Sequence, residues 1–351
     1  MKPKLLILLF VCLLGQARSS AAQPNVTVLR EQGGRVDFSP DGSLIAFDAE
    51  GDDHYTDVYT MDADGTNEQC LTCDHADIPD LHNGNPVWHP DGEYIAFQSQ
   101  DPRHPGLPII GSLYTSPGSG INNDLAVIKR DGTRYQRLTK VGKGGGVLHP
   151  QFSHDGKKII WAERISDRSP GLGQWALKMA DFVVSEDGPA IENIQEFQPG
   201  GFQMYETHGF SPDDRQILFT ACRDKDFFNS DIYLYDLVTR LTEPSEKNWD
   251  EHAHFLPGGE HILWMSSSGI RQKKFAVAPR TDYWIMRKDG TEKKRLTRFN
   301  EDKSSAFYRK TAADWSADPT GGRIVAYLIN GEGKEYRNRG PGPIVFIELD
   351  Q

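Results

Sequence analysis

Four histidines in this chain stand just ahead of tight-turn sequences, and imidazole binds divalent metals and transfers protons near neutral pH. They are His149, His208, His252 and His254, each a few residues before a segment related to Ser-Pro-Asp-Gly. Three or four imidazole nitrogens in one small volume can bind a divalent cation. We therefore treat these histidines as candidate metal ligands, with Mn, Zn or Ca as the candidate ion.

Acidic side chains accompany the histidines. Glu206 lies two residues before His208, and Glu251 directly precedes His252. Carboxylates at such places can orient imidazole rings by hydrogen bonding. The alternative is that the histidines only hydrogen-bond the backbone of their strands, with no ligand site. The candidate ligand-binding residues are the four histidines together with Arg35, Asn85, Glu206 and Glu251.

The turns belong to a unit that recurs through the chain. A strand ends in an aromatic residue, a turn related to Ser-Pro-Asp-Gly follows, and a second apolar strand comes next. The copies are DFSPDGSLIAF from Asp37, VWHPDGEYIAF from Val87, QFSHDGKKIIW from Gln151, GFSPDDRQILF from Gly209, HFLPGGEHILW from His254 and DWSADPTGGRIVAY from Asp314. They are roughly 40 to 65 residues apart, a spacing typical of repeat architectures.

A third and a fourth strand follow in most copies, and the fourth ends in Leu-Thr. Four antiparallel strands per repeat form the blade of a β-propeller. We predict an all-β fold, a six-bladed β-propeller of four-stranded antiparallel blades. Residues repeated at one position of a fold indicate structure. We therefore expect Asp57, Asp124, Asp231 and Asp282 to cap turns, and Trp88, Trp161, Trp264 and Trp315 to pack between blades.

The last repeat lacks a fourth strand of its own. Segment 25–30 alternates apolar and polar residues and can supply that strand, which would close the ring. In a closed ring the strand before each turn is the innermost, so histidines far apart in sequence would meet at the central channel. The predicted blades are 34–72, 84–139, 148–198, 206–246, 250–298 and 311–351, with the strand 25–30 added to the last.

The first 22 residues predict a cleaved secretory signal peptide, with two lysines, the apolar run LLILLFVCLLG and a small-residue cleavage site. An uncleaved anchor is the alternative, but this run is shorter than the roughly 20 residues that span a bilayer. Residues 23–351 contain no Gly/Ser-rich or Pro-rich linker, so we expect one domain. We expect an exported protein, periplasmic or extracellular, monomeric and without a membrane span after cleavage.

The net charge indicates which classes of partner the protein can bind, and the cysteine spacing indicates what the cysteines do. The formal net charge of -11, with acids and bases interspersed, disfavours nucleic acid, whose phosphates require a basic surface. A protein partner or an extracellular carbohydrate fits better. Cys70 and Cys73 form a C-x-x-C without a second pair or a thioredoxin-like helix, so we expect a local disulfide or structural thiols rather than a redox or metal site.

The repeats resemble those of the TolB-type six-bladed propeller family, whose unit is similar to FSPDG-x-x-I-A-F followed by D-I-Y-x-M-D-x-D-G and L-T. Residues 38–47 with 57–72 match it most closely, and the resemblance covers nearly all of the mature chain. It implies the fold. For function it implies three kinds of relative: periplasmic scaffolds that bind protein partners, propeller domains of certain serine peptidases, and oligogalacturonate lyases with a metal near the central channel.

The likeness to the lyases implies that His208, His252 and His254 bind the metal, because that branch uses channel histidines including a His-x-His pair. Two features depart from the branch. Trp249 stands where the lyases have a glutamine ligand, three residues before His252. The arginine that serves them as a base has no definite counterpart.

Two functions follow as hypotheses. The first is an exported scaffold that binds a protein or another ligand through the central channel and through loops on one face, formed by 100–123, 164–174 and 268–281. The second is a metal-dependent carbohydrate-active enzyme similar to oligogalacturonate lyase. Fold alone does not decide between them. Metal bound by the histidines would favour the enzyme.

Overall fold

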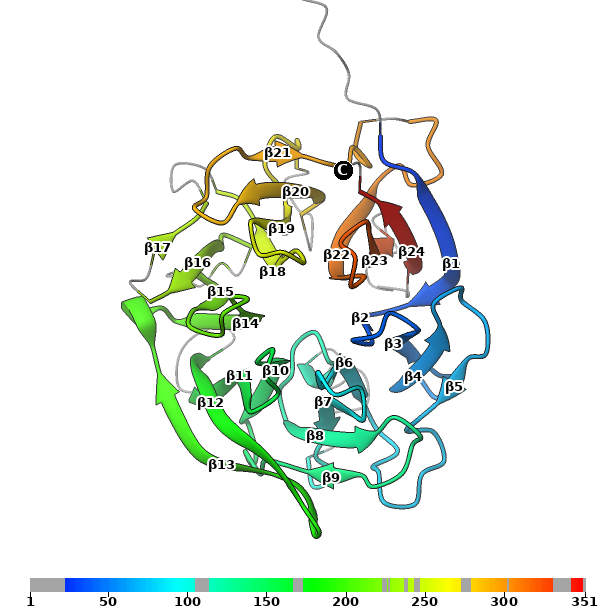
Figure 1. Cartoon of the computed structure of the whole chain (residues 1–351), viewed down its shortest axis with the longest axis vertical. Coiled ribbons are helices and arrows are strands. Elements are labelled where there is room, and N and C mark those ends of the chain that lie inside the picture. The colour runs from blue at the N-terminus through cyan, green and yellow to red at the C-terminus, as the bar shows by residue number, and fades with distance from the viewer. Residues whose placement is uncertain are drawn as a thin grey trace, which may run out of the picture.

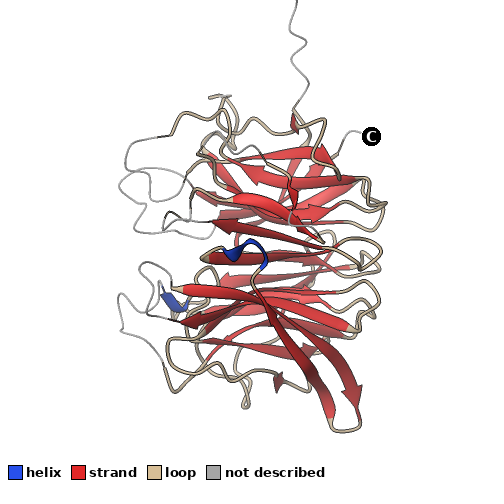
Figure 2. Ribbon diagram, turned by 90° about the vertical axis from the view of Figure 1, so that its left-hand side faces the viewer, coloured by secondary structure: helices blue, strands red, loops and turns tan. Residues whose placement is uncertain are grey.

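The computed structural model describes residues 23–104, 114–166, 173–222, 226, 228–236, 239–242, 247–272, 279–301, 303–330 and 342–349. Within these ranges, strands form six four-stranded antiparallel sheets arranged in a ring around a central axis (Figure 1). In the side view the strands run through the thickness of the disc (Figure 2). The predicted all-β six-bladed propeller is confirmed. The predicted signal peptide lies outside the described residues.

The strands of each of the first three blades follow one another from the channel outward. Blade one contains β2 (Val36–Phe38), β3 (Leu44–Glu50), β4 (Thr56–Asp62) and β5 (Gln69–Cys70). Blade two contains β6 (Asn83–Trp88), β7 (Tyr94–Gln100), β8 (Asn123–Lys129) and β9 (Gln136–Arg137). Blade three contains β10 (Gly146–Phe152), β11 (Lys158–Ser166), β12 (Gln174–Ser185) and β13 (Gly188–Phe197), and the short 3-10 helix η1 (Pro199–Gly201) follows it.

Blades four and five keep this order, and blade six combines both ends of the described chain. Blade four contains β14 (Met204–Phe210), β15 (Ile217–Cys222), β16 (Asp231–Tyr235) and β17 (Thr239–Arg240). Blade five contains β18 (Asp250–Phe255), β19 (His261–Ser266), β20 (Asp282–Arg287) and β21 (Lys294–Arg295). Blade six contains β22 (Lys310–Ala317), β23 (Arg323–Asn330), β24 (Gly342–Glu348) and the N-terminal β1 (Val26–Gly33).

The ring closes through the N-terminal strand, as predicted. β1 pairs antiparallel with β24, with Val26 opposite Ile347 and Val28 opposite Val345. Figure 1 shows β1 running along the outer edge of the last blade before the chain enters blade one. A second tie joins the same blades near the channel, because the Ser316 hydroxyl donates a hydrogen bond of 2.7 Å to Asp37 Oδ1.

The Ser-Pro-Asp-Gly turns are held by their own side chains. Ser39 Oγ donates to Asp41 Oδ1 at 2.7 Å and accepts from the Leu44 amide at 2.9 Å. Gly42 has a φ of +70°, a backbone angle that favours glycine. The same serine-to-aspartate bond recurs at the turns of blades three and four. Local chemistry therefore fixes the hairpin between the first two strands of these blades.

The repeated aspartate and threonine form one structural device. In four blades an aspartate that is the first or second residue of the third strand accepts a hydrogen bond from the threonine hydroxyl after the fourth strand. That hydroxyl accepts from the amide that follows the aspartate. The pairs are Asp57 with Thr72, Asp124 with Thr139, Asp231 with Thr242, and Asp282 with Thr297. The expected structural role of these aspartates is confirmed.

Apolar clusters between neighbouring blades form the core. Trp88, Trp161, Trp264 and Trp315 are all buried, as predicted for repeat positions. Among the described residues, no helix is both long enough and apolar enough to cross a bilayer. The predicted loop face lies partly outside the described residues, since 105–113, 167–172 and 273–278 do.

Candidate functional site

The inner strands of blades two to six share a β-bulge facing the channel. In each, two residues of the inner strand oppose one residue of the next strand. The first bulge residue has a left-handed backbone in three blades, with φ of 56° at Asn85 and 48° at both His149 and His252. Bulges re-aim side chains and are common next to active sites. Here they direct polar side chains toward the axis of the ring.

Three of the predicted metal ligands meet at this level. His149, His208 and His252 each offer a ligand atom, and these atoms all lie within 4.8 Å of one another. The ring centroids of His149 and His252 are 5.2 Å apart, and each is 5.9 Å from that of His208. All three side chains are buried. We call this set the histidine triad.

Neighbouring blades hold the triad in place. Thr207 donates a short hydrogen bond to the His149 carbonyl, and the Trp315 indole donates to the His252 carbonyl at 2.7 Å. His208 Nε2 lies 2.7 Å from the Thr220 hydroxyl. Two bulges are thus fixed from a neighbouring blade, and the His208 ring is fixed by its own blade, which keeps the three imidazoles in position before any ligand arrives.

Two buried carboxyls lie against the triad. Glu206 Oε2 is 3.8 Å from His149 Nε2, and Glu251 Oε2 is 3.6 Å from His252 Nε2. Buried atoms without a hydrogen-bond partner in the described structure include Glu206 Oε2, Glu251 Oε1 and His208 Nδ1. Such an atom costs about 1–3 kcal/mol when nothing satisfies it. Three of them on or beside the triad indicate a place built for a group that binds lone pairs.

Burial sets the protonation of this centre. It lowers the pKa of His149 and of His208 well below the usual range, with the nearby histidines adding to the effect. Burial also raises the pKa of Glu206, and burial together with Glu206 raises the pKa of Glu251 well above its usual range. Ionisation of either carboxyl opposes ionisation of the other, so the doubly charged pair is disfavoured. Neutral imidazoles are the form that binds metals.

His254, the fourth predicted ligand, stands beside the triad. Its ring centroid is 5.8 Å from that of His208 and 5.2 Å from Trp315. The bulge between Glu251 and His254 interrupts the simple alternation of side chains along this strand. Asp314 links the pair instead, with Oδ1 at 3.5 Å from His252 Nδ1 and 3.9 Å from His254 Nε2.

Arg35 and Asn85, the other predicted ligand-binding residues, lie near the same centre. The positive charge of Arg35 acts on His149, Glu206 and Glu251. Asn85 is buried, and its side-chain Nδ2 donates to Gln98 Oε1 at 2.7 Å. Its backbone amide donates to Asp48 Oδ2 at 2.7 Å.

Comparison with known proteins begins with sequence. No family model matches the chain. Dipeptidyl-peptidase 5 of Porphyromonas endodontalis is 23% identical over 299 residues, which cover 71% of this chain and 39% of that protein. The chain thus spans well under half the length of this relative.

Solved structures decide the architecture. TolB from Acinetobacter baumannii superposes with a TM-score of 0.54 at 16% identity, over 92% of this chain and 64% of that one. The fold is that of the TolB-type propellers. An oligogalacturonate lyase from Vibrio parahaemolyticus gives 0.51 at 11% identity, over 95% of both chains. At such identities the likeness concerns the fold alone.

A second group of possible metal ligands lies as close together as the triad. Asp57, Cys70 and Cys73 each offer a ligand atom within 4.8 Å of the others. Cys70 and Cys73 are joined by a disulfide, so their sulfurs are not free thiolates. The expected local disulfide is present, and the triad is the better candidate for a metal.

Asp314 and Asp37 are channel residues that sequence reasoning missed. Burial opposes ionisation of Asp314, but its contacts with His252 and His254 outweigh burial and hold its pKa well below the usual range. Burial raises the pKa of Asp37 to about 6. Both lie within copies of the repeat, where the sequence pattern indicates only a strand or turn residue. Their signal was an aspartate near an inner-strand aromatic, as in Asp37-Phe38 and Asp314-Trp315.

Proposed function

We propose that this chain is an exported propeller that binds a divalent transition metal at the histidine triad and a ligand next to it in the channel. One observation carries the proposal: three buried imidazoles from three blades present ligand atoms within 4.8 Å of one another. Nitrogen ligands suit Zn or Mn, whereas Ca prefers oxygen. His149, His208 and His252 would hold the ion. A bound dication would polarise an oxygen of the ligand.

The buried atoms around the triad support this proposal. A dication would neutralise the cost of placing Glu206 and Glu251 in the interior and would give the unpartnered His208 Nδ1 a bond. The disulfide between Cys70 and Cys73 supports export, because such bonds persist in oxidising compartments. Exported scaffolds without metal remain the simpler alternative within the same fold.

A metal-dependent carbohydrate-active enzyme, as in the lyases, is a second candidate. The pair Glu206 and Glu251 favours it, since buried carboxyls with raised pKa values that lie against the triad can accept and return a proton. Arg35 lies close enough to act on both carboxyls and would attract an acidic sugar. Release of unsaturated products from oligogalacturonate by the metal-loaded protein would support this candidate, and its absence would leave metal binding untouched.

Metal binding is tested by comparing two histidine variants. We expect about one Zn or Mn ion per chain after dialysis, and a loss of affinity of about a hundredfold in His149→Asn. Asparagine tolerates the left-handed backbone of this position, as Asn85 shows at the corresponding bulge. The matched control is His254→Asn, which lies outside the triad and should lower affinity less than about tenfold. Calorimetric titration of each folded variant gives the result.

The proposal fails if the wild-type protein binds neither ion, or if His149→Asn binds as tightly as wild type. Equal losses in both variants would move the site toward His254. Circular dichroism and a urea transition for each variant separate lost binding from lost folding.

A further inference from the structure

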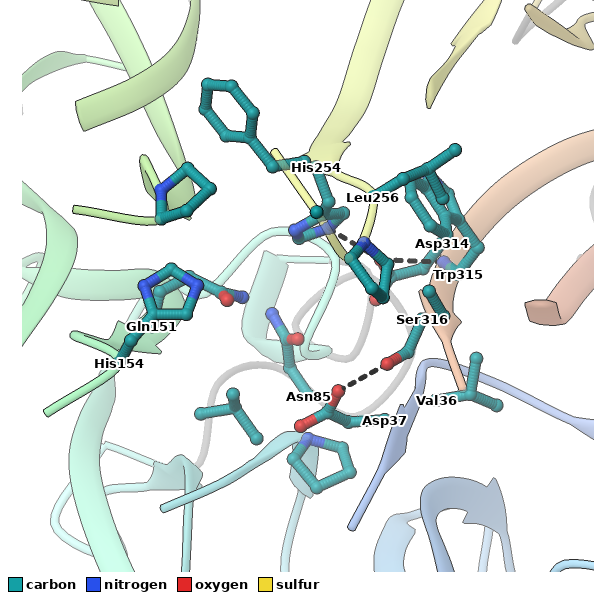
Figure 3. Close-up of a pocket in the computed structure, with 17 residues that line it drawn as sticks. Val36, Asp37, Asn85, Gln151, His154, His254, Leu256, Asp314, Trp315 and Ser316 are labelled. Carbon is teal, nitrogen blue, oxygen red and sulfur yellow. Dashed lines mark hydrogen bonds and ion pairs between the residues drawn. The ribbon is translucent and has the colours of Figure 1, made fainter. Parts of the chain in front are cut away.

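A cavity of about 350 Å³ opens at one end of the channel, where the inner strands reach their turns. Its lining comes from the inner strands or following turns of all six blades, and includes Asp37, Asn85, Gln151, His254 and Asp314. Figure 3 shows these five side chains gathered around one space. A volume of this size suits a small molecule. The cavity is separate from Glu206 and Glu251, which are not among its lining residues.

We propose that this cavity binds a small ligand through a protonated amino group. The proposal does not depend on the metal, because the groups that carry it line the cavity rather than the triad.

The two carboxylates supply the first argument. Asp37 Oδ1 accepts from the Ser316 hydroxyl and Oδ2 accepts from the Trp88 amide, each at 2.7 Å. Each oxygen keeps a second lone pair that can accept a further hydrogen bond. Asp314 Oδ1 accepts from the Trp315 amide at 3.0 Å. An ammonium group carries three donors and a positive charge, which match acceptors of this kind.

The neutral groups of the lining also favour a donor ligand. Asn85 uses its Nδ2 to donate to Gln98, which leaves its carbonyl oxygen as an acceptor. Pro86, Pro212 and Pro257 line the cavity and have no backbone N–H to offer. These groups therefore add an acceptor to the lining and no donor.

Charge excludes the opposite kind of ligand. None of the described residues that line the cavity is lysine or arginine, and Arg35 is not among them although it precedes Val36 in the chain. The two histidines of the lining already face carboxylates, His154 at 2.7 Å from Asp214 and His254 at 3.9 Å from Asp314. A ligand carboxylate would meet the carboxylates of Asp37 and Asp314, and like charges at close range repel.

Three probes that share one ring test the proposal: cyclohexylamine, cyclohexanol and cyclohexanecarboxylate. Calorimetric titration near neutral pH of the chelator-treated protein should show the amine binding at least about tenfold more tightly than the alcohol, with no binding of the carboxylate. Asp37→Asn removes the charge but keeps partners for Ser316 and Trp88. It should reduce amine affinity about tenfold and leave alcohol binding unchanged.

Asp213→Asn is the matched control, since it removes an exposed carboxylate from a turn at the same end of the ring, outside the cavity lining. It should not change amine binding. The proposal is overturned if the alcohol or the carboxylate binds as tightly as the amine, if Asp37→Asn matches wild type, or if no amine binding is seen at millimolar concentration. Because the metal has been removed, none of these outcomes bears on the triad.

Discussion

His149 and His252 have left-handed backbone angles, with φ of 48° at each. A non-glycine residue held there costs of order 1–3 kcal/mol, and such strain gathers at functional sites. The strain is retained because Thr207 and Trp315 bind the carbonyls of the two bulges. At the residue scale, the backbone strain therefore lowers the stability of the fold and places the imidazoles at the channel axis. The convergence of His149, His208 and His252 was predictable, since all three precede the same repeated turn.

Other channel residues were not predictable in the same way. Asp314 belongs to the least regular copy of the repeat, DWSADPTGG, where alternation does not show which face it occupies. A bulge adds one residue to a strand, so residues before the bulge occupy the opposite sheet face from the one that simple alternation predicts from the residues after it. The sequence does not mark bulges here, except by Gly209 in blade four.

His82 offers a residue-scale test by pH. Burial lowers its pKa to about 4 from an ordinary 6.5, so the unfolded chain binds a proton more readily than the folded one. Stability from this group is complete above about pH 6.5 and is lost as pH falls toward 4. We expect His82→Asn to lose less stability than wild type between about pH 7 and about pH 5. Urea midpoints at both pH values measure this, and parallel losses in the two proteins would contradict it.

At the scale of the element, the blades are built from local signals. The Ser-Pro-Asp-Gly turns and the aspartate–threonine pairs each join residues of a single blade, so their spacing in the sequence predicted the strands. The long hairpin of β12 and β13, with 12 and 10 residues, was not predicted as such. Strand length depends on pairing and burial that a repeat pattern does not contain.

The aspartate–threonine pair of blade five can be tested by removing one hydroxyl. Thr297→Val leaves the Tyr283 amide and Asp282 Oδ1 without this partner, where the wild-type bonds measure 2.9 Å and 3.1 Å. We expect a loss of about 2 kcal/mol in the free energy of unfolding. Thr66→Val removes an exposed hydroxyl bonded to Asp64 and should cost less than about 0.5 kcal/mol. Equal effects in the two variants would show that burial of the pair does not matter.

At the scale of the whole molecule, closure brings distant segments together. The triad draws on blades three, four and five, and the cavity draws on all six, so both require a complete ring. β1 and β24 make that ring from the two ends of the described chain. This closure was predictable because the last repeat lacked one strand and segment 25–30 had the right alternation.

Removal of the closing strand tests this dependence. Deletion of 23–32 exposes the edge of β24 and takes away Val26 and Leu29, which pack on the core clusters of blades six and one. We expect a loss of about 3 kcal/mol or more. Val28→Thr, at an exposed position of the same strand, is the control and should change stability little. A deletion variant that unfolds at the wild-type urea concentration would show that the ring does not need β1.

The most direct test of the metal centre is anomalous X-ray scattering from crystals grown with Zn or Mn. The structure predicts one strong peak in the channel, within bonding distance of ligand nitrogens from His149, His208 and His252. A channel without a peak, or a peak only beside Asp57 and the Cys70–Cys73 disulfide, would contradict it.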